Sequence, residues 1–333
     1  MSSILVTGGC GFIGSHVAEH LLRRGHRVTV LDDLSGGFTD NLVDGIEFVQ
    51  GDITNRDLVD RLFAKQRFEY VYHLAAYAAE GLSSFIKRFN YNNNLIGTVT
   101  LINASINHGV KCFVFTSSIA VYGGNPDLPL REEATTTPDD SYGIAKLAAE
   151  FELRACKRMF DLDSIIFRPH NVYGERQNVG DKYRNVVGIF MNQILQDRPM
   201  TVFGDGEQVR AFSYVGDVAP IIAEAVDVPG AYNETFNVGA DRPYTVNDLA
   251  TAVAHAMGAP ATVTHLPPRH EAMSAYSSHD KIRKIFGERP PHTLGQGLER
   301  MAAWAKRHGA RQSHPFADIE VTKNFPAGWL ESQ

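Results

Sequence analysis

Tyr142 and Lys146 are the first candidates for chemistry, because they stand four residues apart in a segment with helical spacing. Side chains four apart share one face of a helix, so the phenol and the ammonium group would be neighbours. A phenol with a pKa of about 10 is a poor base at neutral pH, and an adjacent cation favours its ionised form. The pair therefore predicts a general base, although the same spacing also occurs where the tyrosine is core and the lysine is solvated.

Hydroxyl side chains precede this pair, in the run Phe115-Thr116-Ser117-Ser118 at the end of a strand-like segment. In a parallel sheet, active sites collect at the carboxyl ends of the strands. A serine hydroxyl at this place could bridge the phenolate and a hydroxyl group of a substrate. We predict that the catalytic residues are Tyr142, Lys146, Ser118 and Ser117.

A glycine-rich loop lies between the first predicted strand and the first predicted helix, with glycines at Gly8, Gly11 and Gly14. Such glycines allow a tight turn, a close approach to a pyrophosphate and close packing of the helix on the strand. The N-terminus of the helix adds free N–H groups and a positive dipole end. The loop predicts a dinucleotide site; the alternative is a purely structural turn.

Acidic residues follow at the ends of the next two strands. Asp32 and Asp33 come about 20 residues after the loop, where a carboxylate accepts hydrogen bonds from the ribose hydroxyls and repels a 2′-phosphate. This favours NAD over NADP, although arginines at 23, 24 and 27 precede the strand end. Asp52 could accept a hydrogen bond from the adenine amino group, or it could be the N-cap of the following helix.

A zinc-protease pattern is also present, because His16-Val17-Ala18-Glu19-His20 fits H-x-x-E-H. These residues fall inside the helix after the glycine loop, where one face must pack on the sheet. We therefore expect no metal site.

The elements that must position these residues alternate between short β-branched runs and longer helical patterns, which predicts a doubly wound α/β fold of the Rossmann type with a parallel sheet. We expect residues 1–170 to form an NAD-binding domain. Residues 171–333 would form a smaller, discontinuous mixed α/β domain for the substrate, with segments near 210–240 returning to the first. The strands are expected at 4–7, 27–31, 48–51, 70–74, 112–116 and 164–168, and the helices at 12–24, 57–66, 84–108 and 142–160.

Composition excludes several classes of protein. The chain of 333 residues is 44% hydrophobic and 21% charged, which is ordinary for a globular protein. A net charge of −6 without a basic stripe argues against nucleic-acid binding, and no apolar run is long enough to span a membrane. Three widely spaced cysteines and an N-terminus that leads directly into a strand predict a cytoplasmic protein with reduced thiols.

The combined motifs resemble the extended short-chain dehydrogenase/reductases, in particular the nucleotide-sugar epimerase/dehydratase family and its UDP-hexose 4-epimerase branch. The resemblance runs from Thr7 to about Leu298. It is carried by TGGCGFIG (7–14), LDDLS (31–35), GDI (51–53), HLAA (73–76), YNNNLIGT (91–98), FTSSIAVYG (115–123), YGIAK (142–146), RPHNVYG (168–174), FGDGEQVRAFSYVGDVA (203–219) and PPR (267–269).

This resemblance implies a role for each matching position. The family's cofactor is NAD, and its contacts would come from Gly8, Gly11, Phe12, Ile13, Gly14, Asp32, Asp33, Asp52, Ile53, Leu74, Ala75, Ala76, Asn94, Thr116, Tyr142, Lys146 and Pro169. Tyr142 would be the base and Ser118 its partner. The substrate would be held by Glu80, Ser118, Asn171, Val186, Arg210 and Arg269. For Arg210, a surface salt bridge is the alternative reading.

The reaction depends on acids and bases beside the tyrosine. Related 4,6-dehydratases carry Asp-Glu directly after the serine position, decarboxylases a glutamate and 3,5-epimerases a cysteine, whereas this chain has Ile119-Ala120. The resemblance thus implies 4-epimerisation of a UDP-hexose or UDP-hexuronate: oxidation at C4, rotation of the 4-keto sugar and return of the hydride.

Three alternatives to this reaction remain. They are a reaction like that of GDP-mannose 3,5-epimerase (which the loop 77–83 faintly resembles) or another epimerase or dehydratase of the family, a net NAD(P)-dependent oxidoreductase, and a non-catalytic NAD-binding regulator. Relatives commonly pair the helices corresponding to 84–108 and 142–160, which implies a homodimer.

Overall fold

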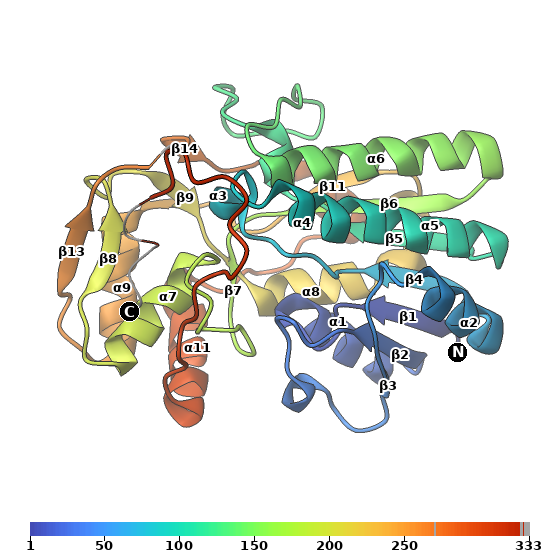
Figure 1. Cartoon of the computed structure of the whole chain (residues 1–333), viewed down its shortest axis with the longest axis horizontal. Coiled ribbons are helices and arrows are strands. Elements are labelled where there is room, and N and C mark those ends of the chain that lie inside the picture. Colours follow the sequence, from blue (N-terminus) through green and yellow to red (C-terminus); the bar gives the residue numbers. More distant parts are fainter. Residues whose placement is uncertain (270, 327–328, 330–333) are drawn as a thin grey trace.

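A seven-stranded, entirely parallel sheet forms the centre of the computed structural model, which describes residues 1–269, 271–326 and 329 (Figure 1). Its order is β11-β6-β5-β4-β1-β2-β3. The strands are β1 (Ser3–Thr7), β2 (Arg27–Asp32), β3 (Glu47–Gln50), β4 (Tyr70–His73), β5 (Cys112–Thr116), β6 (Asp163–Pro169) and β11 (Thr235–Val238). The predicted fold class is confirmed.

Helices cover both faces of this sheet, because its central strands carry apolar side chains on both sides. One face packs against α1 (Phe12–Arg23) and α8 (Val215–Ala223). The other packs against α2 (Arg56–Gln66), α5 (Gly97–Asn107) and α6 (Ser141–Phe160). None of the helices in the described part of the chain is long and apolar enough to cross a membrane.

The strand order reverses between β1 and β4, which are neighbours in the sheet although two strands separate them in sequence. In open parallel sheets a crevice forms at such a point, outside the carboxyl ends of the strands. The glycine loop after β1 and Thr116 at the end of β5 therefore lie at one edge of the sheet.

The helix predicted for 84–108 is present from Lys87 to Asn107, where α4 (Lys87–Tyr91), the π-helical η2 (Asn92–Ile96) and α5 follow one another in helical conformation. It starts three residues later than predicted, because its N-cap Ile86 has a non-helical φ of −133°. The short helix α3 (Glu80–Ser83) precedes it. A π-helical turn inserts where the Asn94 amide bonds to the backbone of Tyr77, at 2.9 and 3.1 Å, and so ties the helix to the loop after β4.

A smaller mixed lobe follows β6 and lies at one end of the sheet (Figure 1). Its two small sheets and one short pair of strands pack on helices α7, α9 and α11. Its helices are α7 (Val186–Leu195), α9 (Val246–Met257) and α11 (Leu294–His308), whereas α10 (Asp280–Phe286) packs on β11 of the main sheet. Its strands are β7 (Val172–Tyr173), β8 (Met200–Phe203), β9 (Val209–Ala211), β10 (Ser213–Tyr214), β12 (Pro243–Thr245), β13 (Val263–Leu266) and β14 (Ser274–Ala275).

Short 3₁₀ turns connect several of these elements: η1 (Thr39–Asn41), η3 (Ile119–Tyr122), η4 (Ala225–Asp227) and η5 (Pro229–Ala231). After α7 and the lobe's first strands, the chain returns to the main sheet, where β11 pairs in parallel with β6.

Candidate active site

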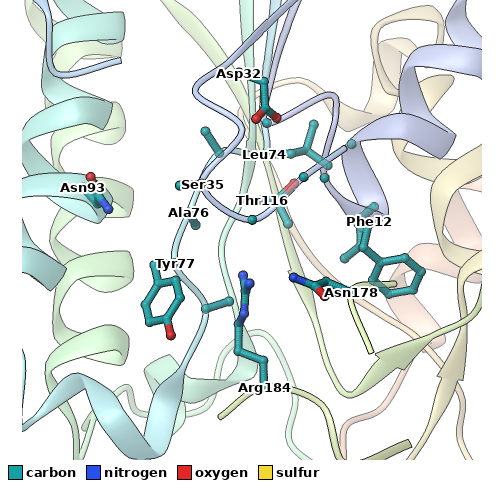
Figure 2. Close-up of a pocket in the computed structure, with 18 of the residues that line it drawn as sticks. Phe12, Asp32, Ser35, Leu74, Ala76, Tyr77, Asn93, Thr116, Asn178 and Arg184 are labelled. Atoms are coloured by element: carbon teal, nitrogen blue, oxygen red, sulfur yellow. The ribbon is translucent and has the colours of Figure 1, made fainter. Parts of the chain in front are cut away.

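A cleft of about 330 Å³ opens at the carboxyl ends of the strands (Figure 2). It brings together most of the residues that the sequence predicted. Those that line it are Gly8, Gly11, Phe12, Ile13, Gly14, Asp32, Asp33, Asp52, Ile53, Leu74, Ala75, Ala76, Thr116, Ser117, Ser118, Tyr142, Lys146, Pro169 and Asn171.

The glycine loop has the geometry of a phosphate cradle. Gly8 has a φ of +71°, and a Cβ on it would lie 2.6 Å from the backbone nitrogen of Ala75. A Cβ on Gly14 would collide with the carbonyl oxygen of Gly8. Only glycine meets both conditions, and α1 then starts with its free N–H groups at the cleft.

Acidic residues mark the far end of the cleft. The carboxylate of Asp32 accepts hydrogen bonds from the backbone N–H groups of Cys10 (3.0 Å) and Leu34 (2.8 Å), while burial raises its pKa. Asp52 accepts from Thr54 N–H at 2.7 Å, but the N-cap of α2 is Asn55. The alternative reading of Asp52 as the helix cap is therefore wrong.

The lysine is fixed by the end of β5. Lys146 Nζ donates to the carbonyl oxygen of Thr116 at 2.8 Å and lies 4.7 Å from the ring centroid of Phe115. Burial lowers the pKa of Lys146 to about 7, with the carboxylate of Glu150 acting in the opposite direction. Beside it, Thr116 Oγ1 is buried and has no hydrogen-bond partner among the described residues. An orphaned hydroxyl next to a cationic lysine fits the ribose and amide of a nicotinamide dinucleotide.

Tyr142 lies at the start of α6, whose N-cap Asp140 accepts from the N–H of Gly143 at 2.9 Å. Burial and the nearby charge of Glu80 raise the pKa of Tyr142, while a hydrogen bond with Ser118 lowers it. Lys146 Nζ lies 5.8 Å from the ring centroid of Tyr142, so the ammonium group is the neighbour that the spacing predicted.

Ser117 differs from Ser118 although both line the cleft. Ser117 is 1% exposed, and its hydroxyl donates to Glu150 Oε1 at 2.6 Å. Its side chain is thus committed to a buried acid behind the cleft. Ser118 accepts from the N–H of Ala120 at 3.1 Å and also reaches the Tyr142 phenol.

Five predicted residues lie outside this cleft: Glu80, Asn94, Val186, Arg210 and Arg269. Asn94 is buried against the Tyr77 backbone, and its neighbour Asn93 lines the cleft instead. Arg210 and Arg269 share the carboxylate of Glu271, at 3.2 and 3.1 Å. The salt bridge considered as the alternative for Arg210 is therefore present, and the carboxylate of Glu271 contacts both guanidinium groups.

The sequence did not identify several lining residues, among them Tyr77, Asn178 and Arg184 (Figure 2). Arg184 points into the cleft, with its Nε 2.6 Å from Asp181 Oδ2 and its guanidinium 4.8 Å from the ring centroid of Tyr77. Its Nη2 would lie 3.0 Å from a Cβ on Gly36. The glycine pair Gly36-Gly37 was the sequence signal that could have indicated a close contact of this loop with another segment, here Arg184.

Within the described ranges, no group of three or more histidine, cysteine, aspartate and glutamate side chains could hold a metal ion. In the H-x-x-E-H segment, His16 Nε2 contacts the carbonyl oxygen of Glu175 at 3.0 Å. Glu19 is paired with Arg23 and Arg176.

The parallel sheet, the glycine cradle at its reversal point and the Ser118–Tyr142–Lys146 set define a nicotinamide-dinucleotide enzyme of the short-chain dehydrogenase/reductase class. The sequence model of the NAD dependent epimerase/dehydratase family matches residues 4–239. The chain belongs to this family.

Similar proteins carry related names. A UDP-glucose 4-epimerase of Mycolicibacterium smegmatis is 36% identical over 301 residues, which are 88% of this chain and 95% of that protein. The structure of a Thermotoga maritima UDP-glucose 4-epimerase with UDP-glucose superposes with a TM-score of 0.88 at 35% identity, covering 92% of this chain and 99% of that one. A UDP-glucuronic acid 4-epimerase from Bacillus cereus, in complex with UDP-glucuronic acid and NAD, superposes with a TM-score of 0.84 at 28% identity, covering 92% of this chain and 99% of that one. The family and its NAD cofactor are thus as predicted.

Proposed function

We propose that this protein is an NAD-dependent nucleotide-sugar 4-epimerase whose substrate is a UDP-hexose. The observation that carries this proposal is a cleft that holds the phenol of Tyr142 beside Ser118. Ser118 is followed in the chain by Ile119 and Ala120, where the resemblance places the extra acids of dehydratases and decarboxylases. The relatives named above, which act on UDP-sugars, support the same reaction.

Each residue of the site has a proposed task. Tyr142 takes the proton of the sugar's 4-hydroxyl, directly or through Ser118, and later returns it. Lys146 and Thr116 hold the nicotinamide ribose end of the cofactor, and Asp32 holds the adenosine ribose. When bound, NAD supplies the acceptor and donor of the hydride. Arg210 and Arg269 bind the diphosphate in place of Glu271, so the nucleotide stays fixed while the oxidised sugar turns.

We also propose a homodimer formed by the face that α6 and η2 present to solvent. Ile96, Ile144 and Phe151 are large apolar side chains there, and Phe151 is 55% exposed. Contiguous exposed apolar side chains of this kind usually mark an interface. A cytoplasmic location is proposed as well, because Cys10, Cys112 and Cys156 are all unpaired thiols.

The test of the reaction is product analysis by proton NMR. The protein is incubated with a panel of UDP-, GDP- and dTDP-sugars, and then with the accepted sugar deuterated at C4. We expect the C4 epimer with the label retained at C4 and no entry of solvent deuterium at C3, C5 or C6. Solvent label at C3 or C5 would overturn 4-epimerisation and indicate a 3,5-epimerase, whereas transfer of the C4 label to C6 would indicate a dehydratase.

A further inference from the structure

The C-terminal segment folds back on the short helix α3. We call residues 315–326 and 329 the strap. In Figure 1 this red segment runs from α11 past β7 and α4. Trp329 is 5% exposed and packs in an apolar cluster with Ala79, Leu82 and Ile86. The strap is therefore a packed part of the structure.

Backbone hydrogen bonds fix the strap where α3 gives way to α4. The Glu320 carboxylate accepts from the N–H groups of Arg88 (2.8 Å) and Phe89 (3.0 Å), at the exposed N-terminus of α4. The N–H groups of Glu320 and Val321 donate to the carbonyl oxygen of Phe85, at 2.9 and 3.1 Å. An acidic side chain at a helix N-terminus is stabilising, so the strap caps the start of α4.

Aromatic contacts extend the strap to the cleft wall. The ring centroid of Trp329 lies 5.3 Å from that of Tyr183, and the backbone N–H of Phe316 donates to the Tyr183 hydroxyl at 3.0 Å. Tyr183 is the neighbour of Arg184, which lines the cleft. Trp329 would also lie 3.3 Å from a Cβ on Gly81, so the strap packs directly on α3.

Helix α3 is in turn fastened to the base. The hydroxyl of Ser83 accepts a hydrogen bond from the backbone N–H of Tyr142 at 3.1 Å and bonds to the carbonyl oxygen of Glu80 at 2.7 Å. A displacement of α3 would therefore move both Glu80 and the backbone of Tyr142.

Glu80 begins the short helix that links the reacting end and the phosphate end of the site, because Ser83 bonds to Tyr142 and a Cβ on Gly81 would lie 4.0 Å from Arg269 Nη1. Its charge acts on the Tyr142 phenol, and the charges of Arg210 and Arg269 act on Glu80 in turn. Its side chain is open to solvent, yet the surrounding protein and the charge of Asp140 raise the pKa of Glu80 to about 7. A sugar that joins a diphosphate on the arginines to a hydroxyl at Tyr142 must pass Glu80.

We propose that α3 and the strap form the wall that selects the sugar, and that Glu80 makes this wall accept an uncharged hexose and reject a hexose with a carboxylate at C6. This inference rests on the proposed nucleotide-sugar substrate. Two carboxylates that face each other repel, whereas a carboxylate accepts hydrogen bonds from sugar hydroxyls. Once a diphosphate engages Arg210 and Arg269, these two arginines no longer offset the charge of Glu80 against a uronate.

The first test compares UDP-glucose and UDP-glucuronate as substrates of the NAD-loaded protein. We expect the wild type to prefer UDP-glucose in kcat/KM by at least about tenfold, and Glu80→Gln to reduce that preference by a similar factor, mainly through a lower KM for UDP-glucuronate. Glu288→Gln is the matched control, because Glu288 is exposed and remote from α3. Equal use of both sugars by the wild type would overturn the inference and leave the 4-epimerase intact. Turnover of neither would overturn both.

The pH profile separates a charge effect from a structural one. Lowering the pH from about 8 to about 6 protonates a group whose pKa is near 7, so the preference for UDP-glucose should fall in the wild type. The charged groups that face Glu80 are Asp140, Arg210, Arg269 and Glu271, together with the phenol of Tyr142. The preference of Glu80→Gln should not change with pH in this range, and a profile equal to that of the wild type would contradict the role of Glu80.

The positioning role of the strap is tested with Trp329→Ala and the conservative Trp329→Phe. We expect Trp329→Ala to raise the KM for UDP-glucose and to reduce the preference for UDP-glucose over UDP-glucuronate. The amount of bound NAD, measured by absorbance, should not change. Trp329→Phe should restore the wild-type KM and the wild-type preference. A Trp329→Ala protein that is less stable but keeps the wild-type preference would show that the strap only stabilises the fold.

Discussion

Glu150 and Arg168 form a bidentate ion pair with both side chains buried, at 0% and 2% exposure. Glu150 Oε1 accepts from Arg168 Nε at 2.9 Å and Oε2 accepts from Nη2 at 2.6 Å. Ser117 and Tyr122 complete the network on either side, at 2.6 Å from Glu150 and 2.7 Å from Arg168. The pair therefore joins α6, which carries the base, to β5 and β6 behind the cleft.

Breaking this pair should destabilise the protein strongly. Arg168→Met leaves the buried carboxylate of Glu150 without its main counterion, and the expected loss in free energy of unfolding is about 3–5 kcal/mol. Denaturant unfolding measures it. Arg131→Ala, which removes an ion pair between exposed side chains, is the control and should change the midpoint little. Equal midpoints for both variants would contradict the prediction.

Removing the phenol oxygen should stop catalysis without releasing the cofactor. For Tyr142→Phe we expect turnover to fall about 10²–10⁴-fold, the usual contribution of a general base. The ring remains to pack in the cleft, so the NAD content of the purified protein should equal that of the wild type. A near-full rate would remove Tyr142 from the mechanism.

Asp32 should matter for the cofactor more than for the sugar nucleotide. Asp32→Ala removes the carboxylate proposed to bind the adenosine ribose, so NAD retention should fall far more than UDP-sugar affinity, as measured by calorimetry. Asp44→Ala is the control, because Asp44 is exposed and does not line the cleft. Equal losses for both ligands would mean that Asp32 holds the loop through Cys10 and Leu34.

Acid should destabilise the fold partly through His170. This buried imidazole bonds to the Ala211 carbonyl oxygen at 3.1 Å and to His279 Nε2 at 3.1 Å, and His279 bonds to Asp241 at 2.7 Å. Burial and the neighbouring His279 lower the pKa of His170 from 6.5 to about 3.

Between about pH 3 and pH 6.5, His170 binds a proton in the unfolded chain but not in the folded protein. The contribution to stability is therefore complete above pH 6.5 and is lost as the pH falls toward 3, by up to about 1.4 kcal/mol per unit. His170→Gln should reduce the slope of stability against pH, and the exposed His255→Gln should leave it unchanged. An unchanged slope in His170→Gln would refute the assignment.

A charge at the proposed dimer face should give monomers. Phe151→Glu places a carboxylate on the exposed apolar face of α6, where an interface would have to bury it. Light scattering at micromolar concentration should give twice the mass of one chain for the wild type and for Lys65→Glu on α2, but the mass of one chain for Phe151→Glu. A monomeric wild type would refute the dimer.

The sequence by itself determined the sheet and the cofactor cleft. Strand ends such as Asp32 and Thr116 could be placed because parallel strands end at the same edge of a sheet. The loop after β1 was predictable from Gly8, Gly11 and Gly14, because the tight turn there leaves no room for a Cβ. The base was likewise predictable, since Tyr142 and Lys146 are one helical turn apart and need no distant partner to share a face.

Tertiary structure alone decided what the distant segments contribute. The helix expected at 84–108 begins at Lys87 and contains a π-helical turn where Asn94 bonds to Tyr77, a contact that no local periodicity encodes. The sequence does not distinguish Ser117 from Ser118, whereas in the folded protein the Ser117 hydroxyl donates a hydrogen bond to Glu150 of α6. The pKa of Tyr142 depends on burial and on Glu80, which are properties of the folded chain, because desolvation and charge act through space and not along the sequence.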